Sequence, residues 1–238
     1  MTRVLAVVPC FNEQRSVGRV VAEIRAHLPE ADVLVVDDCS TDGTLMAAQA
    51  AGAEVVSLCV NLGVGGAMRV GYRYADEHGY GVVLQVDGDG QHDSALARPL
   101  LAAVMNGADL VIGARFAGTG DYDVRGPRRW SMRLLAAVLS RRTGVRLSDT
   151  TSGFRATSPR ATRLFARHYA AEYLGDTIEA IVLASKAGLV IEQVPVAMRA
   201  RTTGRPSAGS WRAVLYLGRV LLALLLSSVR RFPSQVDA

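Results

Sequence analysis

Short apolar runs alternate along the chain with longer segments in which apolar residues recur every three or four positions. The runs are typical of buried strands, and the recurring positions are typical of helices that bury one face. The predicted strands occupy residues 4–8, 33–36, 55–58, 82–86 and 110–113. The predicted helices occupy residues 17–28, 45–51, 61–78 and 94–105. Because strand and helix alternate with short connections, the pattern predicts an α/β fold with a mostly parallel sheet flanked by helices.

Polar clusters follow four of the predicted strands. They occupy residues 9–13, 37–44, 61–67 and 87–92. The carboxyl ends of parallel strands lie at one edge of a sheet, and ligands bind beyond that edge near a switch in strand order. We therefore expect the four clusters to share one rim.

The cluster after the fourth strand carries two acids. Asp87 and Asp89 stand at positions i and i+2 where a buried strand runs out, so their side chains point to the same side. With the amide of Gln91 they offer hard oxygen ligands that suit Mg²⁺ or Mn²⁺. The alternative is an acidic Asp-Gly turn that caps the next helix. His92 is interpreted as a turn or helix-start residue rather than a base.

After residue 115 the pattern is less regular. The predicted elements are a glycine-rich loop at 118–127, a basic helix at 128–142, a helix at 176–187, a strand at 190–194 and a basic loop at 199–207. The tail at 211–231 is apolar, but Arg219 interrupts it and leaves too few apolar residues for a membrane span. Its polar residues form one stripe on a helix, which favours an interfacial amphipathic helix. The alternative is a helix docked on the domain or on a partner subunit.

Composition narrows the class of protein only moderately. Half of the 238 residues are apolar, which allows one large α/β domain with a short appendage. The net charge of +5 fits an anionic small substrate or an acidic membrane surface as well as nucleic acid, so charge does not choose the partner. We expect no nucleic-acid partner. All the cationic residues except Lys186 are arginines, which suit bidentate phosphate contacts. The three cysteines lack metal-type spacing and indicate a reducing compartment.

Five segments considered together point to a family. They are Val-Pro-Cys-Phe-Asn-Glu (8–13), Asp-Asp-Cys-Ser-Thr-Asp-Gly-Thr (37–44), Asn-Leu-Gly-Val-Gly-Gly-Ala (61–67), Asp-Gly-Asp-Gly-Gln-His (87–92) and Gly-Ala-Arg-Phe (113–116). In this order they resemble family 2 glycosyltransferases of the GT-A fold, a Rossmann-like α/β architecture. The match is close to the branch of dolichyl- or polyprenyl-phosphate mannose or glucose synthases. The second half matches more loosely, through residues 151–155 and 201–207.

The resemblance implies a division of the chain and a role for each matching residue. A glycosyltransferase domain would span 1–209, with a nucleotide-sugar half at 1–116 and an acceptor half at 117–209, followed by the amphipathic tail at 210–238. The implied nucleotide-sugar site comprises Pro9, Asn12, Glu13, Asp37, Asp38, Gly65, Asp87 and Asp89. The implied metal ligands are Asp87, Asp89 and Gln91. The implied acceptor-phosphate contacts are Arg115, Arg128 and Arg129, with Arg155, Arg201 and Arg205 as further candidates. Asp89, Arg115, Arg128 and Arg129 would be the catalytic residues.

The implied reaction transfers a hexose, with inversion, from a nucleotide diphosphate sugar to a polyprenyl or dolichyl phosphate at the cytoplasmic face of the membrane. An acceptor phosphate is already anionic and needs no strong base, whereas a hydroxyl acceptor would need one, such as Asp149 or Glu179. GDP-mannose and UDP-glucose both remain open as donors, and so does a homo-oligomer. The alternatives are transfer to a hydroxyl of a soluble or cell-envelope acceptor, and a non-catalytic nucleotide-sugar-binding partner of a membrane protein. A nucleotidyltransferase would want a basic glycine-rich loop after the first strand, and an NAD-dependent oxidoreductase would carry its glycine motif there.

Overall fold

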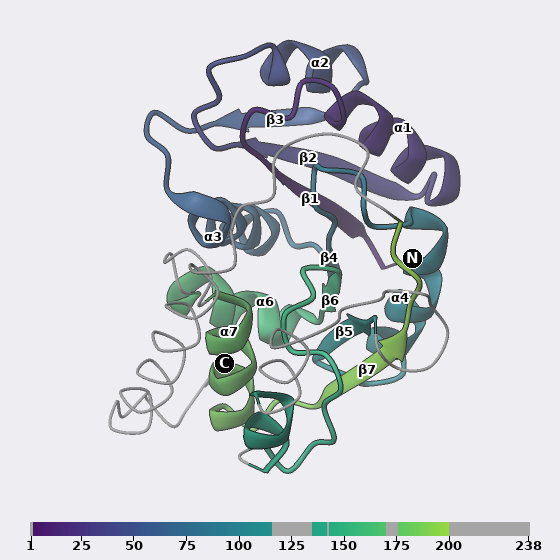
Figure 1. Ribbon diagram of the computed structural model, residues 1–238, viewed down its shortest axis with the longest axis vertical. Helices are drawn as coiled ribbons and strands as arrows, with labels where there is room; N and C mark the ends of the chain where they lie inside the picture. The colour runs from purple at the N-terminus through teal and green to yellow at the C-terminus, as the bar shows by residue number, and fades with distance from the viewer. Residues whose placement is uncertain (1, 116–134, 142, 170–175, 200–238) are drawn as a thin grey trace, which may run out of the picture.

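The computed structural model describes residues 2–115, 135–141, 143–169 and 176–199 (Figure 1). A sheet of seven strands runs through this part of the chain. The strands are β1 (Val4–Cys10), β2 (Ala31–Asp37), β3 (Glu54–Ser57), β4 (Val82–Gln85), β5 (Leu110–Ala114), β6 (Arg155–Thr157) and β7 (Ile191–Pro195). The helices are α1 (Val17–His27), α2 (Thr44–Ala50), α3 (Gly63–Glu77), α4 (Ala97–Met105), α6 (Pro159–His168) and α7 (Asp176–Lys186), with a 3₁₀ turn η1 at Ser94–Leu96. Residues 135–141 are also helical.

The strands are arranged in the order β3-β2-β1-β4-β6-β5-β7. All neighbouring pairs are parallel except those of β6, which runs antiparallel to both β4 and β5. The predicted mostly parallel α/β sheet is therefore confirmed. The order also reverses at β1, because β2 and β3 lie on one side of it and β4 on the other. A crevice between the carboxyl ends of β1 and β4 is where such folds bind ligands.

Two elements of the second half were not predicted from the sequence. One is β6, a three-residue strand that begins with the basic residue Arg155 and carries no apolar run. The other is α6, whose start is marked by Ser158: its side chain accepts from the backbone N–H of Ala161, and Pro159 occupies the first turn. The Ser-Pro pair was the signal in the sequence that could have indicated this helix.

Helices cover both faces of the sheet, as the alternation of strand side chains requires (Figure 1). Along β1, Leu5 and Val7 pack in the core beneath α3, α6 and α7, whereas Ala6 and Val8 pack in the core beneath α1, α2 and α4. The fully buried pattern of β1, with every residue inside, is typical of a central strand of a parallel sheet.

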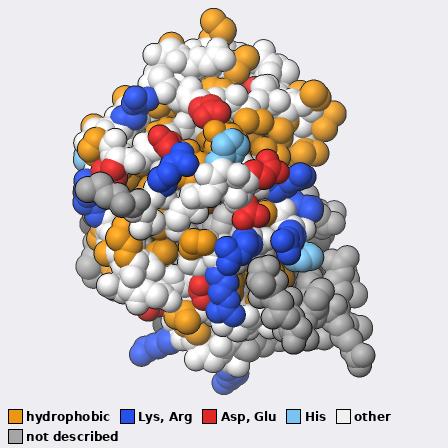
Figure 2. Space-filling view, turned by 180° about the vertical axis from the view of Figure 1, so that it is seen from behind, with side chains coloured by type: hydrophobic (Ala, Val, Ile, Leu, Met, Phe, Trp, Pro, Cys, Tyr) orange, Lys and Arg blue, Asp and Glu red, His pale blue; other side chains and the backbone are white. Residues whose placement is uncertain are grey.

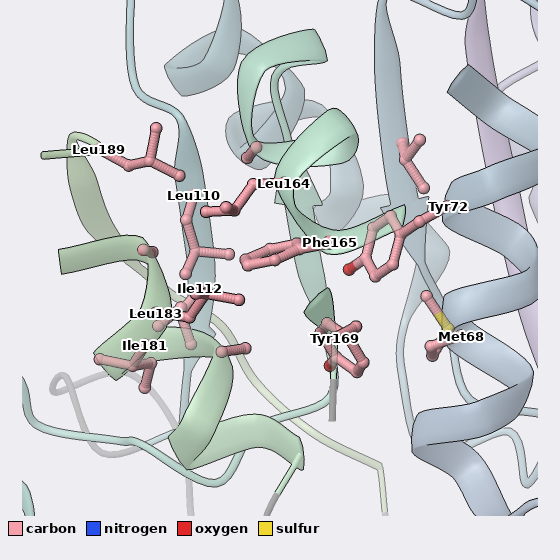
Figure 3. Close-up of a cluster of buried hydrophobic side chains, with 14 of the residues drawn as sticks. Met68, Tyr72, Leu110, Ile112, Leu164, Phe165, Tyr169, Ile181, Leu183 and Leu189 are labelled. Atoms are coloured by element: carbon pink, nitrogen blue, oxygen red, sulfur yellow. The ribbon is translucent and has the colours of Figure 1, made fainter. Parts of the chain in front are cut away.

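The core under α3 and α6 is aromatic. Figure 3 shows Phe165 of α6 lying between Tyr72 of α3 and the side chains of Leu110 and Ile112 from β5. The ring centroids of Tyr72 and Phe165 are 5.3 Å apart, and those of Tyr72 and Tyr169 are 5.2 Å apart. Tilted aromatic pairs at this spacing contribute beyond their buried area. Helix α6 is thus packed against α3 and β5 through these side chains.

The first strand extends through Pro9, where the sequence pattern predicts its end. The carbonyl of Val7 accepts from Val86, on the β4 side, whereas the carbonyl of Cys10 accepts from Asp38, on the β2 side. Because hydrogen-bonding directions alternate along a strand, the missing N–H of Pro9 falls on the β4 side. Pairing with β4 has already ended at Val7, so the proline breaks no ladder bond.

Charges on the surface are mixed. Figure 2 shows arginine and carboxylate side chains interspersed across the face seen from behind. Several are paired, for example Arg98 with Glu30 at 3.2 Å. Within the part of the chain that the structure describes, no helix combines the length and the apolar character needed to cross a membrane.

Candidate functional site at the switch point of the sheet

The acidic cluster follows β4 at the point where the strand order reverses, between β1 and β4. A Cβ atom at Gly88 would lie 2.5 Å from Sγ of Cys10 and 3.2 Å from the carbonyl oxygen of Pro9. Glycine is therefore required at 88, because any larger residue would separate the two strand ends. This close approach places Asp87 and Asp89 at the point where the strand order reverses.

The residues after β4 alternate between buried and partly exposed positions. Asp87, Asp89 and Gln91 are partly exposed, whereas Gly88, Gly90 and His92 are buried. Gly90 has a φ of 75°, and the backbone N–H of Gln91 donates to Oδ1 of Asp89 at 2.9 Å. The two acids and the amide therefore share the exposed side of one tight turn.

The carboxylate of Asp87 is contacted by two buried, polar side chains. The amide nitrogen of Gln85 donates to its Oδ1 at 3.3 Å, and Nε2 of His92 lies 3.5 Å from its Oδ2. The backbone N–H of Asp87 donates to Nδ1 of His92 at 3.0 Å. His92 is 3% exposed and its ring stacks on Phe154, with centroids 5.0 Å apart. His92 lies in an isolated antiparallel bridge with Met198 rather than in a turn, which corrects the interpretation of this residue. Nothing in the sequence pattern indicated its contact with Asp87.

A bound divalent cation is compatible with this donor set. No group of three or more His, Cys, Asp or Glu side chains that could form a complete metal cage occurs among the described residues. Two partly exposed carboxylates and an amide instead match ions that keep open positions for water and substrate phosphates, as Mg²⁺ does. The partners of Asp87 that the structure describes are neutral, because a histidine whose Nδ1 accepts a hydrogen bond carries its single proton on Nε2.

The two acids at the end of β2 are buried and organise the rim. Asp38 accepts from the backbone N–H groups of Leu62 and Gly63, at 2.7 and 2.8 Å, and so fixes the start of α3. Asp37 accepts from the backbone N–H of Ser40 at 3.2 Å and from the hydroxyl of Ser57 at 3.0 Å. Each is 3% exposed.

The expected nucleotide-side residues of the first cluster meet the second cluster. Asn12, with a φ of 57°, donates its backbone N–H to the hydroxyl of Ser40 and accepts the N–H of Thr41, both at 2.9 Å. The backbone N–H of Glu13 donates to the hydroxyl of Thr44 at 2.8 Å. Pro9 is buried in β1, and Gly65 is buried in the first turn of α3. The structure thus brings all four polar clusters together, and the predicted shared rim is confirmed.

Arg115, at the end of β5, forms a buried ion pair. Its Nε and one terminal nitrogen donate to the two carboxylate oxygens of Asp149, at 2.6 and 2.9 Å, and the same terminal nitrogen donates to the hydroxyl of Thr151 at 2.5 Å. Burial raises the pKa of the Asp149 carboxyl, but the hydrogen bonds and charge of Arg115 outweigh it and hold the pKa below the usual 3.8. Asp149 is therefore a poor general base, which corrects the suggestion that it could activate a hydroxyl acceptor.

Arg155 does not offer its guanidinium to a ligand. It is 1% exposed, and its nitrogens donate to the backbone carbonyls of Thr150, Ser152 and Thr177 at 2.7–3.3 Å. A guanidinium held by three carbonyls inside the protein orders the segment before β6. Its expected role as an acceptor-phosphate contact is therefore replaced by a structural one.

The remaining candidates lie outside the described residues. They are Arg128, Arg129, Arg201 and Arg205, together with the glycine-rich loop at 118–127 and the tail at 210–238. The last described arginine before that tail is Arg199, which bridges Glu23 at 2.6 Å and Asp93 at 2.9 Å.

Comparison with known proteins identifies the family. The model of glycosyl transferase family 2 matches residues 5–166, which is more than half of the chain. The protein therefore belongs to glycosyl transferase family 2, and the resemblance drawn from the five segments is confirmed.

Two curated relatives belong to the same branch as that resemblance. The chain is 39% identical over 161 residues to an undecaprenyl-phosphate mannosyltransferase of Micrococcus luteus. It is 32% identical over 166 residues to a polyprenol monophosphomannose synthase of Mycolicibacterium smegmatis. Each match covers 65% of this chain, and the matches span 65% and 61% of the two relatives, somewhat less than two thirds of their lengths.

The fold is shared with solved structures of low sequence identity. The glucosyl-3-phosphoglycerate synthase of Mycobacterium tuberculosis, in complex with Mn²⁺, UDP and glucosyl-3-phosphoglycerate, superimposes with a TM-score of 0.71 at 22% identity. The match covers 98% of this chain and 82% of that protein. At this identity the likeness concerns the fold.

Proposed function

We propose that this protein transfers a hexose from a nucleotide diphosphate sugar to a polyprenyl phosphate, with inversion at the anomeric carbon. The observation that carries the proposal is the turn at 87–91, where two carboxylates and an amide emerge together at the switch point of a family 2 sheet. Both curated relatives described above have names that include a polyprenyl phosphate acceptor or product and mannose. The lipid acceptor is carried over from that similarity, and the metal-dependent donor site is inferred from the ligands that the turn offers.

On the donor side, Asp87, Asp89 and Gln91 would hold Mg²⁺ or Mn²⁺. The chemistry that such an ion supplies when bound is electrostatic stabilisation of the diphosphate as it leaves the sugar. Asp37 and Asp38 support this site indirectly: they fix the loops that start α2 and α3, so that backbone groups of these loops face the rim. Asn12, Glu13 and Gly65 would complete the nucleotide pocket.

On the acceptor side, the ion pair of Arg115 with Asp149 favours a phosphate over a hydroxyl. A hydroxyl acceptor needs a base, and Asp149, the buried carboxylate that contacts Arg115, is neutralised by that guanidinium. A phosphate is already anionic and can attack directly. Arg115 is held rigidly at the end of β5 and would orient the acceptor, with Arg128, Arg129, Arg201 and Arg205 as the further phosphate contacts.

The place of action follows from the acceptor. A polyprenyl phosphate resides in a membrane, and a nucleotide sugar is made in the cytoplasm, so we place the reaction at the cytoplasmic face of the cell membrane. The amphipathic segment at 210–238 would hold the protein there, with leucines toward the lipid and arginines toward the head groups.

The test is the nature of the product. Radiolabelled GDP-mannose and UDP-glucose are each incubated with the protein and Mn²⁺, with and without undecaprenyl phosphate in detergent micelles. We expect label from one donor to enter the organic phase only when the lipid phosphate is present. A water-soluble glycosylated product would instead assign a hydroxyl acceptor, and the absence of turnover with binding of the nucleotide sugar would assign a non-catalytic partner.

A further inference from the structure

The geometry around Asp87 points to a role for His92 and Gln85 that sequence reasoning does not assign. We propose that these two buried side chains are positioning residues, which fix the Asp87 carboxylate in the orientation that binds the cation. The proposal rests on the metal-dependent donor site proposed above, but not on the identity of the acceptor.

Each carboxylate oxygen of Asp87 faces a different neutral donor. Gln85 contacts Oδ1 at 3.3 Å from the strand side, and His92 contacts Oδ2 at 3.5 Å from the far side of the turn. Both distances are longer than an ordinary N–H···O hydrogen bond, so the two neutral side chains contact the carboxylate without cancelling its charge. Outer partners of this kind commonly set the orientation of metal ligands.

The imidazole ring of His92 is itself fixed on several sides. Its Nδ1 accepts the N–H of Asp87 itself, which determines that the proton sits on Nε2, the atom that faces the carboxylate. Phe154 stacks on the ring, and the backbone of His92 forms an isolated antiparallel bridge with Met198. The N–H of Arg199 also donates to the carbonyl of Gln91 at 3.0 Å. The residues that follow β7 therefore hold the metal-binding turn.

Gln85 supplies a second, independent observation. It is 2% exposed, and its Oε1 has no hydrogen-bond partner in the described part of the chain. Leaving a buried acceptor unpaired destabilises a protein. The reverse orientation of the Gln85 amide would place its Oε1 against an oxygen of Asp87, and two acceptors repel each other. The unpaired Oε1 is therefore explained if Gln85 is retained because its N–H group donates to Asp87.

Gly153 closes the third side of the carboxylate. A Cβ atom at this position would lie 2.8 and 2.9 Å from the two oxygens of Asp87. The Asp87 side chain thus occupies a space defined by Gln85, His92 and Gly153, and a methyl group at 153 would displace it without altering either donor.

The experiment measures Mn²⁺ binding directly, from the electron paramagnetic resonance signal of free Mn²⁺, with UDP or GDP present and no sugar transfer. His92→Asn keeps an acceptor for the Asp87 N–H but cannot reach its carboxylate, and it should weaken Mn²⁺ binding by about 10- to 100-fold. His92→Gln can place an N–H near the position of Nε2, and it should stay within about threefold of the natural protein. His78→Gln is the matched control and should have no effect, because His78 is an exposed histidine just after the C-terminal end of α3.

Gln85→Met separates positioning from stability. Removing the unpaired acceptor should leave the Tm unchanged or raise it, while Mn²⁺ binding weakens by about tenfold. Gly153→Ala should weaken binding with both donors intact. Gly18→Ala is its control, because the nearest atom to the added methyl group is 3.6 Å away, an ordinary contact.

The outcomes decide the proposal. Folded His92→Asn and Gln85→Met proteins that bind Mn²⁺ as tightly as the natural chain would overturn it, as would a natural protein that binds no Mn²⁺ with either nucleotide. If the His92 variants do not fold, Gln85→Met and Gly153→Ala still decide. Intact Mn²⁺ binding without a lipid-linked product would overturn the proposed acceptor and leave the positioning role standing.

Discussion

Asp87 and Asp149 lie near the same rim, but they differ in exposure and in the charge of their neighbours. The side chain of Asp87 is 35% exposed and its described partners are an amide and a neutral imidazole ring. The side chain of Asp149 is 0% exposed and forms a bidentate pair with Arg115. A carboxylate whose neighbours are neutral keeps its negative charge available for a cation. A carboxylate paired with a guanidinium is already neutralised, and the pair stabilises the fold. The charge of the neighbouring groups therefore distinguishes an acid that can bind a ligand from an acid that stabilises the fold.

The largest expected effect concerns the structural acid. Asp149→Asn leaves the guanidinium of Arg115 buried without a counter-charge, and breaking a buried pair in this way costs about 3–5 kcal/mol. Urea unfolding should show this loss in the free energy of unfolding. Glu30→Gln is the control, because its pair with Arg98 is exposed on both sides and contributes at most about 1 kcal/mol. An equal loss of unfolding free energy in the two variants would show that the pair of Asp149 with Arg115 contributes no more than a surface ion pair.

The functional acid should show the reverse pattern. Asp89→Asn removes one of the two charges at the metal-binding turn, and sugar transfer under saturating Mn²⁺ should fall by roughly 10²- to 10³-fold. The free energy of unfolding should change by less than about 1 kcal/mol, because Asp89 is partly exposed. Asp76→Asn, an exposed acid near the end of α3, is the matched control and should keep full activity. Full activity in Asp89→Asn would contradict the proposed donor site.

The strands of the first half and the buried contacts around β6 differ in how well the sequence predicted them. The strands from β1 to β5 were found because each is an apolar run, and a polar cluster follows four of them; both are local signals. The structural role of Arg155 was not found, since its carbonyl partners come from residues 150, 152 and 177, and only the folded chain brings them together. The contact of His92 with Asp87 was missed for a related reason. The buried stack of His92 on Phe154 depends on the residue just before β6, a strand that has no apolar run of its own.

A smaller effect is expected in the pH dependence of stability. Burial tends to raise the pKa of Asp149, but Arg115 lowers it below 3.8, so the folded state binds this proton less tightly than the unfolded state. The stabilisation is therefore complete above about pH 4 and is lost as the pH falls through the depressed folded pKa. Unfolding of the natural chain and of Asp149→Asn, followed from pH 7 downward, should give curves that converge at acid pH. Curves that stay parallel would show that Arg115 does not lower the pKa of Asp149.

The smallest effect concerns two of the three thiols, those of Cys10 and Cys59, whose reactivity can be compared without any mutation. Cys10 is 3% exposed; burial, then the charges of Glu13, Asp37 and Asp87, raise the pKa of its thiol far above the usual value. Cys59 is exposed. Because the thiolate is the reactive form, iodoacetamide at pH 8 should modify Cys59 in the folded protein and Cys10 only after unfolding. Mass spectrometry of the labelled peptides measures both rates. Equal rates would mean that the end of β1 at Cys10 opens to solvent in the folded protein. The turn that packs against it could then not hold Asp87 and Asp89 in a fixed orientation.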